Sequence, residues 1–447
     1  MDLHNQSDPL ADLLARGRYP QALPLAQAAV DRLPDDAPAA ARAAALETLG
    51  VVLRELGEYA RAEGPLLQAL SARGGAGKES PAYARTLTEL GRLYEEQARY
   101  ANAEKLFRSA LELCEQAGGP DHLDVADRLY DLGKLLDHLG RFDEATACHD
   151  RARAIHQAHG VDRPEYALSL AAGAWADWRR GRLEQAAEAV RTATALLART
   201  RGEDHPDYAT CCQFLSRICL HQARIDEAES LADKVLAVRR ARLGERHHRY
   251  GGALENLALI RTLQGRADEA TALARQGLEI TRQALGERHP FVADGLAALA
   301  YALQAAGHPD EAEVQAREAL AVCEAALGAD HPHLANCHRD LAEAVAAQHR
   351  TDEADTHYLR ALDILRPYGP TCRVEIIETL QGRARLLAVC NRPDEAVAAA
   401  AAGGCPGARP EPTAVVRCCW RAGWTAWRAC TRRSASWPRR SRSGARC

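Results

Sequence analysis

Residues 243–290 read LGERHHRYGGALENLALIRTLQGRADEATALARQGLEITRQALGERHP. The stretch opens with LGERH, and the same motif begins again 42 residues later, at Leu285. Between the two copies lie two amphipathic runs, which a short QGRADEA turn separates. Apolar residues recur in both runs at helical spacing. We therefore predict a pair of helices, over Tyr250 to Gln264 and Asp268 to Ala284, joined by a tight turn.

The short turn recurs along almost the whole chain, at intervals of 40 to 42 residues. A fixed period of this length indicates a solenoid, in which each unit packs against its neighbours. The Gly that opens most copies tolerates the left-handed conformation that ends a helix. We expect the Asp two or three residues later to cap the next helix, and the following Glu to favour its positive end. The ten copies begin at Gly17, Gly57, Ala98, Gly140, Gly181, Ala223, Gly265, Gly307, His349 and Asn391.

A small residue follows each turn at a constant distance. We expect it to lie where the two helices of a pair cross closely, because a large side chain there would hold the backbones apart. Its copies are Ala62, Ala103, Ala145, Ala186, Ala228, Ala270, Ala312 and Ala354.

Composition and charge exclude several classes of function for this protein. Aromatic residues make up only 5% of the chain, and no strand-like enrichment is visible. The net charge of −4 divides into +9 for residues 403–447 and −13 for the rest, which argues against nucleic acid as the main partner. We see no signal peptide and no apolar run that could span a membrane. The 14 cysteines form no CxxC pair, which favours reduced thiols in a cytoplasmic protein.

The segment 403–447 departs from the repeat. The pattern stops inside a second helix, after DEAVAAAAAG, and the remainder is rich in Arg, Cys and Trp. A frameshift near Ala400 would explain this composition, since GC-rich codons supply these residues when read out of frame. A basic disordered tail and a cysteine-rich metal module are the alternatives. The module is disfavoured because Cys405, Cys418, Cys419 and Cys430 lack ligand spacing.

Two motifs could suggest a bound ligand. Five histidines share one position in the longer loop between units, but stacked units lie about 10 Å apart, too far to share one metal ion. We expect these histidines to bond the backbone instead. GGAGKES at Gly74 resembles a phosphate loop faintly, without its first Gly, its metal-binding hydroxyl or a preceding strand. No HExxH, GxSxG or GxGxxG motif supports catalysis. The five histidines are His122, His205, His247, His289 and His331.

The 42-residue spacing, the LG..HP loop and the LENLA helix resemble the tetratricopeptide repeat, in the variant found in kinesin light chains and their bacterial relatives. The resemblance implies an all-α solenoid of antiparallel helix pairs in a right-handed superhelix. It also implies that the first helix of each pair lines a concave, peptide-binding groove, without catalysis or cofactor. We expect a lead over residues 1–9, about ten units over residues 10–402, and the irregular tail over residues 403–447.

Candidate binding residues lie on the first helices of the pairs. We assume that a recurring pair of Leu and a small residue faces the neighbouring helices, so that the flanking side chains point into the groove. The pairs are Leu49–Gly50, Leu90–Gly91, Leu132–Gly133, Leu257–Ala258, Leu299–Ala300 and Leu341–Ala342. The flanking candidates are Glu89, Arg92, Asp131, Lys134, Trp175, Trp178, Phe214, Arg217, Glu255, Asn256, Tyr301, Arg339, Asp340 and Glu343.

Two of these candidates stand out. The resemblance implies that Asn256, in the family's LxNLA position, bonds the main chain of a ligand, because an amide both donates and accepts. Most other units have lost this Asn, so uniform reading of a ligand backbone is not expected. Trp175 and Trp178, three residues apart, lie on one helical face. They either form an apolar pocket for a ligand side chain or fill space between units.

These features predict a cytoplasmic, non-catalytic scaffold that binds peptides or extended protein segments in its concave groove. No metal, nucleic acid or membrane is expected, and the sequence does not determine the oligomeric state. An alternative is a sensing or regulatory array, whose effector is a partner or a lost C-terminal domain. An enzyme accessory subunit is a third interpretation.

Overall fold

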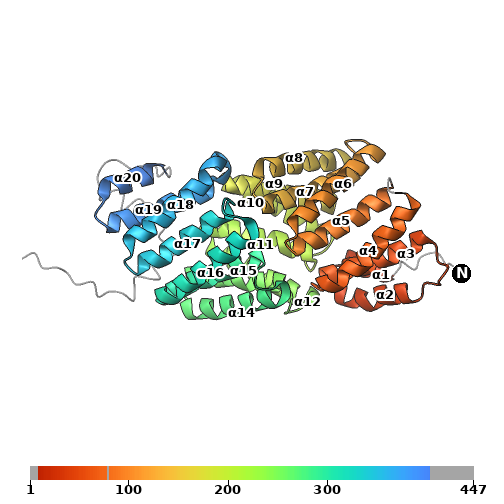
Figure 1. The fold of residues 1–447 in the computed structure, drawn as a ribbon, viewed down its shortest axis with the longest axis horizontal. Coiled ribbons are helices and arrows are strands. Elements are labelled where there is room, and N and C mark those ends of the chain that lie inside the picture. Colours follow the sequence, from red (N-terminus) through yellow and green to blue (C-terminus); the bar gives the residue numbers. More distant parts are fainter. Residues whose placement is uncertain (1–8, 78–79, 403–447) are drawn as a thin grey trace, which may run out of the picture.

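The computed structural model describes residues 9–77 and 80–402, and these residues form antiparallel helix pairs (Figure 1). The pairs follow the predicted period, so unit 1 is α1/α2 and unit 10 is α19/α20. The first helices of the pairs are α1 (Pro9–Ala15), α3 (Ala39–Glu55), α5 (Pro81–Glu96), α7 (Leu123–His138), α9 (Pro164–Arg179), α11 (Pro206–His221), α13 (His248–Leu263), α15 (Pro290–Ala306), α17 (His333–Ala347) and α19 (Arg373–Val389).

The second helices complete the pairs, and one 3₁₀ helix, η1 (Arg366–Cys372), joins units 9 and 10. First helices of successive units contact one another, from α3 with α5 to α17 with α19, and form the inner layer. The second helices form the outer layer. They are α2 (Tyr19–Asp31), α4 (Tyr59–Ala76), α6 (Tyr100–Gly118), α8 (Phe142–His159), α10 (Leu183–Thr200), α12 (Ile225–Arg242), α14 (Ala267–Leu285), α16 (Pro309–Leu327), α18 (Thr351–Leu365) and α20 (Pro393–Ala402).

The short turn has the predicted backbone but not the predicted cap. Its first residue is left-handed in all ten copies, with φ between 55° and 87°, even where Ala98 replaces Gly. The expectation that Asp caps the outer helix is wrong. The N-cap of α8 is Arg141, at a ψ of 61°, and its side chain makes no capping bond. Asp143 already lies inside the first turn, while Glu144 pairs with Arg141 at 2.6 Å.

The small residues after the turn are buried as predicted. Ala62, Ala145 and Ala270 have no exposed surface, nor do the five other predicted alanines. Because the side chains are short, the inner and outer helices approach closely at these points. The predicted pairs of Leu and a small residue are buried in the same layer.

The loop histidines bond the backbone, as expected. Each Nδ1 atom accepts a hydrogen bond from the backbone N–H two residues later. Four of these histidines are the N-caps of their inner helices, whereas His331 lies one residue before the N-cap of α17, Pro332. For example, His289 Nδ1 lies 3.2 Å from the Phe291 nitrogen, and His205 Nδ1 lies 3.1 Å from the Asp207 nitrogen. His122 accepts from Asp124 in the same way.

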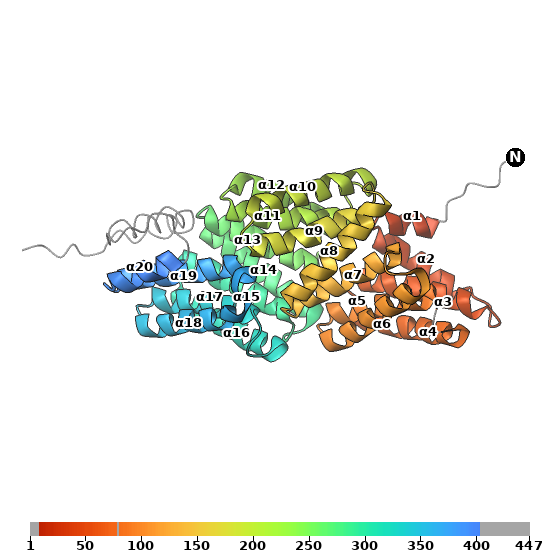
Figure 2. The same cartoon turned by 90° about the horizontal axis from the view of Figure 1, so that it is seen from above.

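The stack of units coils back on itself, so that helices of the second half lie beside those of the first (Figures 1 and 2). The turn of each of the first five units lies against the start of the inner helix five units later. A Cβ atom on Gly17 would lie 2.5 Å from Pro206, and one on Gly140 would lie 2.7 Å from Pro332. We call these contacts the seam. They join Gly17 to Pro206, Gly57 to His247, Glu96 to His289, His138 to His331 and Gly181 to Arg373.

Candidate functional site

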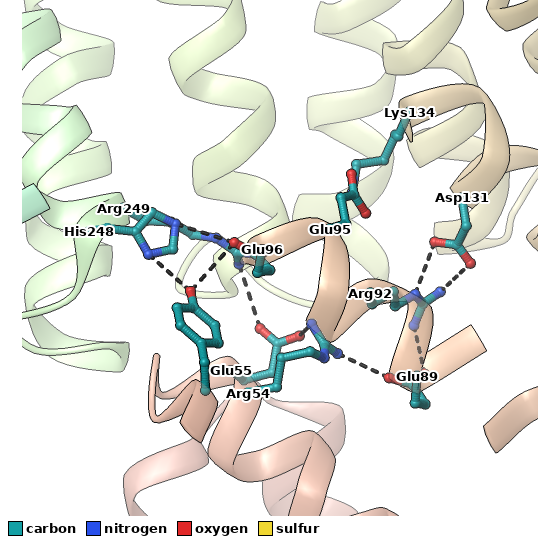
Figure 3. A network of polar contacts seen from close by, with 11 residues as sticks. Arg54, Glu55, Glu89, Arg92, Glu95, Glu96, Asp131, Lys134, His248 and Arg249 are labelled. Carbon is teal, nitrogen blue, oxygen red and sulfur yellow. Dashed lines mark hydrogen bonds and ion pairs between the residues drawn. The ribbon is translucent and has the colours of Figure 1, made fainter. Parts of the chain in front are cut away.

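The predicted binding residues fall into separate groups on the inner helices. The first is ionic and links α3, α5 and α7 (Figure 3). Arg92 makes two parallel hydrogen bonds to the Asp131 carboxylate, each 2.9 Å long. Glu89 accepts from Arg92 at 2.8 Å and from Arg54 at 3.1 Å. These charges satisfy one another across three units, so a ligand would have to displace existing pairs to reach them.

Lys134 stands at the edge of this group. Its Nζ lies 3.6 Å from Glu95, and 41% of its side chain remains exposed. The Glu95 carboxylate dominates its surroundings, and together with weaker neighbouring charges it raises the pKa of Lys134 despite burial. Lys134 therefore stays charged and keeps surface that another anion could reach.

The ionic group continues onto α13, through residues that the sequence interpretation missed (Figure 3). Arg249 pairs with Glu96 and, at 3.5 Å, with Glu55. His248 Nε2 lies 3.4 Å from Glu96, and its Nδ1 lies 3.0 Å from the Tyr59 hydroxyl. Burial opposes the charge on Glu96, but Arg249 and His248 hold the pKa of this carboxyl well below its usual value. This contact joins the first coil of the chain, which is formed by units 1 to 5, to the second coil, which is formed by units 6 to 10.

A signal for this contact was present in the sequence. Glu55 and Glu96 are the last residues of α3 and α5. Carboxylates are disfavoured at a helix C-terminus, where the macrodipole is negative. An acidic residue there needs a cation from elsewhere in the fold, and here Arg249 supplies it.

The second group is aromatic. The ring centroids of Trp175 and Trp178 lie 4.9 Å apart, and Phe214 lies 4.9 Å from Trp175. Trp178 is buried in the hydrophobic core, and its ring lies 5.2 Å from the ring of His221, so it fills space between units 5 and 6. Trp175 and Phe214 are only half-buried. Of the two interpretations of the Trp pair, packing describes Trp178, while Trp175 keeps accessible surface.

Arg217 lies on α11 beside the half-buried rings. Its side chain is exposed, and its guanidinium carbon lies 6.0 Å from the centroid of Trp175. Within residues 9–77 and 80–402, no carboxylate lies at ion-pair distance from Arg217. Glu255 and Asp294 attract Arg217 electrostatically without forming a direct ion pair with it. This arrangement combines a cation that has no direct ion pair with apolar ring surface, and it can accept a carboxylate from outside the chain.

Glu255 and Asn256, in the middle of the array, are both held by the protein itself. Asn256 is 8% exposed and donates to Ser216 Oγ at 3.1 Å, which joins α13 to α11. Glu255 lies among glycines, and a Cβ on Gly295 would be only 2.7 Å from its Oε1. Thr281 Oγ1 donates to the same oxygen at 3.3 Å. Burial raises the pKa of Glu255 to about 8.

The last group lies near the end of the array. Arg339 Nη1 donates to Glu378 at 2.7 Å, and Arg339 Nη2 lies 3.3 Å from Asp340. Burial raises the pKa of Asp340 to about 6, against the attraction of Arg339. Glu343 accepts from Arg385 at 3.4 Å. Tyr301, the remaining candidate, is half-buried on α15.

Two surface hollows lie away from these candidates. One of about 800 Å³ is lined by residues such as Leu183, Arg191 and His221, and one of about 440 Å³ by residues such as His149 and Arg180. Neither is lined by a predicted binding residue. In the part of the chain that the structure describes, no three His, Cys, Asp or Glu side chains gather as a metal site, and no helix is long and apolar enough to cross a membrane.

Several solved structures are similar to this chain to different degrees. A Rap protein complexed with Competence and Sporulation Factor aligns with a TM-score of 0.59 at 14% identity, covering 81% of this chain and 97% of that one. BtubC (BKLC) from P. vanneervenii aligns with a TM-score of 0.39 at 21% identity, covering 52% and 91%. A putative kinesin light chain from Podosopora anserina aligns with a TM-score of 0.29 at 19% identity, covering 55% and 96%. No curated protein matches the chain.

Family models agree with the helical period. Models described as tetratricopeptide repeat match residues 42–74, 82–158, 176–241, 250–325 and 315–366. Together these ranges cover more than half of the chain. The chain belongs to the tetratricopeptide repeat family.

Proposed function

We propose that the chain is a non-catalytic scaffold whose inner helices bind an extended segment of a partner protein. Tetratricopeptide repeat proteins typically serve as interaction scaffolds, and the Rap protein of similar fold is complexed with Competence and Sporulation Factor. The cytoplasmic location and the lack of nucleic-acid binding, both expected from the sequence, remain part of this proposal.

The observation that carries the proposal is Arg217. Most other candidate charges, including Arg92 and Arg339, already pair within the chain. Arg217 is exposed without a carboxylate partner among the described residues, and Trp175 and Phe214 present ring surface beside it. A segment that carries a carboxylate next to an apolar side chain would satisfy both features at once.

The experiment is selection of binders from a random peptide library on the immobilised chain. We expect enriched peptides to carry Asp, Glu or a free C-terminus beside an apolar residue. Arg217→Glu should weaken such peptides at least tenfold, on the order of 1.4 kcal/mol. Arg275→Glu is the matched control, because Arg275 is an exposed arginine on the outer helix α14 and should have no effect.

A fluorescence measurement locates the bound peptide. The emission of the stacked Trp175 and Trp178 should change on binding once the four tail residues Trp420, Trp424, Trp427 and Trp437 are replaced by Phe. Binding that survives Arg217→Glu with unchanged emission would place the peptide elsewhere. A regulatory array with a separate effector predicts the same binding, and it would additionally require an effector protein to be recruited or released by the peptide.

A further inference from the structure

The loop histidines differ in one respect that their shared hydrogen bond to the backbone does not explain. His205, His247, His289 and His331 lie at the starts of the inner helices of units 6 to 9, and all four lie in the seam. The first three are 3%, 4% and 6% exposed. His122 begins the inner helix of unit 4, which has no turn five units earlier to meet, and 51% of its side chain is exposed. The same position of the repeat is therefore buried in units that meet an earlier turn and exposed in unit 4, which does not.

Each seam histidine is held in a neutral form by its contacts. Nδ1 accepts from a backbone N–H, so this nitrogen carries no proton. The proton is then on Nε2, which in His289 lies 3.1 Å from the Glu96 carbonyl oxygen and in His331 lies 3.0 Å from the His138 carbonyl oxygen. A second proton on Nδ1 would point at the backbone N–H that it now accepts from. Protonation therefore breaks this hydrogen bond and displaces the ring from the seam.

The surroundings of these rings also oppose a positive charge. Burial lowers the pKa of all four, to about 4 for His247 and His331. The charged and titratable groups that face the four rings, from both coils, are Glu55, Glu96, His138, Arg201, Asp207, Arg239, His248, Arg249, Asp294 and His333. The carboxylates among them partly offset burial, while the cations add to it.

We propose that the seam opens in response to pH. Protonation of its four histidines separates the two coils of the chain, while the helix pairs stay folded. With the seam closed, each of the first five turns covers the start of one of the later inner helices. With the seam open, these helix starts become accessible. If the inner face binds a peptide as proposed above, opening would let the peptide enter from the side.

The test uses the free, full-length chain. Small-angle X-ray scattering gives the radius of gyration, and circular dichroism gives the helix content, from about pH 7.5 to about pH 3.5, so that the range passes below the pKa of about 4 of His247 and His331. We expect the radius of gyration to rise on acidification while the helix content stays constant. No ligand is needed, so the result is independent of whether the inner face binds a peptide.

Variants assign the effect to the seam. The quadruple variant His205→Gln, His247→Gln, His289→Gln and His331→Gln carries side chains that cannot be protonated, so it should stay compact through the whole range. His122→Gln should expand like the wild type. If the quadruple variant is already expanded at about pH 7.5, His289→Gln/His331→Gln replaces it, and its expansion must shift to lower pH by about one unit or more.

Three results would overturn the proposal. The wild type could keep a constant radius of gyration, it could expand only together with loss of helix, or the seam variants could expand at the same pH as the wild type. Asp340 and Glu375 also titrate in this range, because burial raises their pKa values to about 6 and about 7. Both are unchanged in every variant, so an expansion that they cause would persist when the histidines are replaced.

Discussion

Gly91 of α5 lies directly against the ring of Phe107 in α6, where a Cβ on Gly91 would be 2.6 Å from the Cε1 atom. Gly50 faces Leu66 at 2.5 Å in the same way, one unit earlier. In these two pairs, the glycine therefore sets how closely the inner helix approaches its outer partner.

Gly91→Ala should lower the free energy of unfolding by about 1–3 kcal/mol, because the fully buried Phe107 ring cannot move away from the new methyl group. Gly64→Ala is the control, since a Cβ there meets nothing within 4 Å. It should raise stability by about 0.4–1 kcal/mol, by restricting the unfolded chain. Urea denaturation measures both. Equal effects of the two substitutions would contradict the contact.

Ala270→Leu tests the close crossing of α13 and α14. Ala270 has no exposed surface, so overpacking should destabilise the array by about 1–3 kcal/mol. Ala272→Leu, at an exposed position of the same helix, should change stability by less than about 0.5 kcal/mol. A melting curve of Ala270→Leu that matches the wild type would show that the helices separate there without cost.

Asp131→Asn tests the ionic group. The Asp131 side chain is 2% exposed and accepts both bonds of Arg92, so its neutralisation should cost about 3 kcal/mol. Asp162→Asn removes the carboxylate of a pair whose side chains are 66% and 81% exposed, and its effect should stay below about 1 kcal/mol. Chemical denaturation at neutral pH compares the two. A small loss for Asp131→Asn would mean that water replaces the carboxylate.

Glu255 should make stability depend on pH. Its pKa of about 8 in the folded chain exceeds its usual value of 4.5, so its stabilising contribution is complete below about pH 4.5 and is lost as the pH rises through 8. Glu255→Gln mimics the protonated side chain. It should raise the free energy of unfolding at pH 7 by on the order of 3 kcal/mol. The exposed Glu279→Gln on α14 should not. Denaturation at several pH values distinguishes them.

The structural features that lie within a single unit could be predicted from the sequence. The period predicted the helix pairs, and the left-handed turns followed from Gly57 and its equivalents. The expected Asp cap failed because the outer helix begins one residue before Asp143, at Phe142. Contacts between adjacent units, such as Arg92 with Asp131, join positions about one period apart, and complementary charges at that spacing indicate them.

The seam was not predictable from any single unit. The number of units in one coil depends on the small rotation between neighbouring units, added over five units. No local residue pattern determines this total rotation. Arg249 and Glu96, 153 residues apart, therefore appeared as unrelated charges. The Glu255 carboxylate was expected in a groove, whereas glycines on α14, in the same unit, and on α15, in the next, receive it.

The sixth unit of this array packs against the first. The array therefore needs at least six units to form such a contact, and the contacts always join units that are five apart. A straight array can gain or lose a repeat by gene duplication almost anywhere, because each repeat needs only its neighbours. Here, one extra repeat between Gly57 and His247 would misalign the pairs that span it, and each histidine would meet the wrong turn. Duplication would be tolerated best at the two ends, so this fold restricts where its own gene can change length.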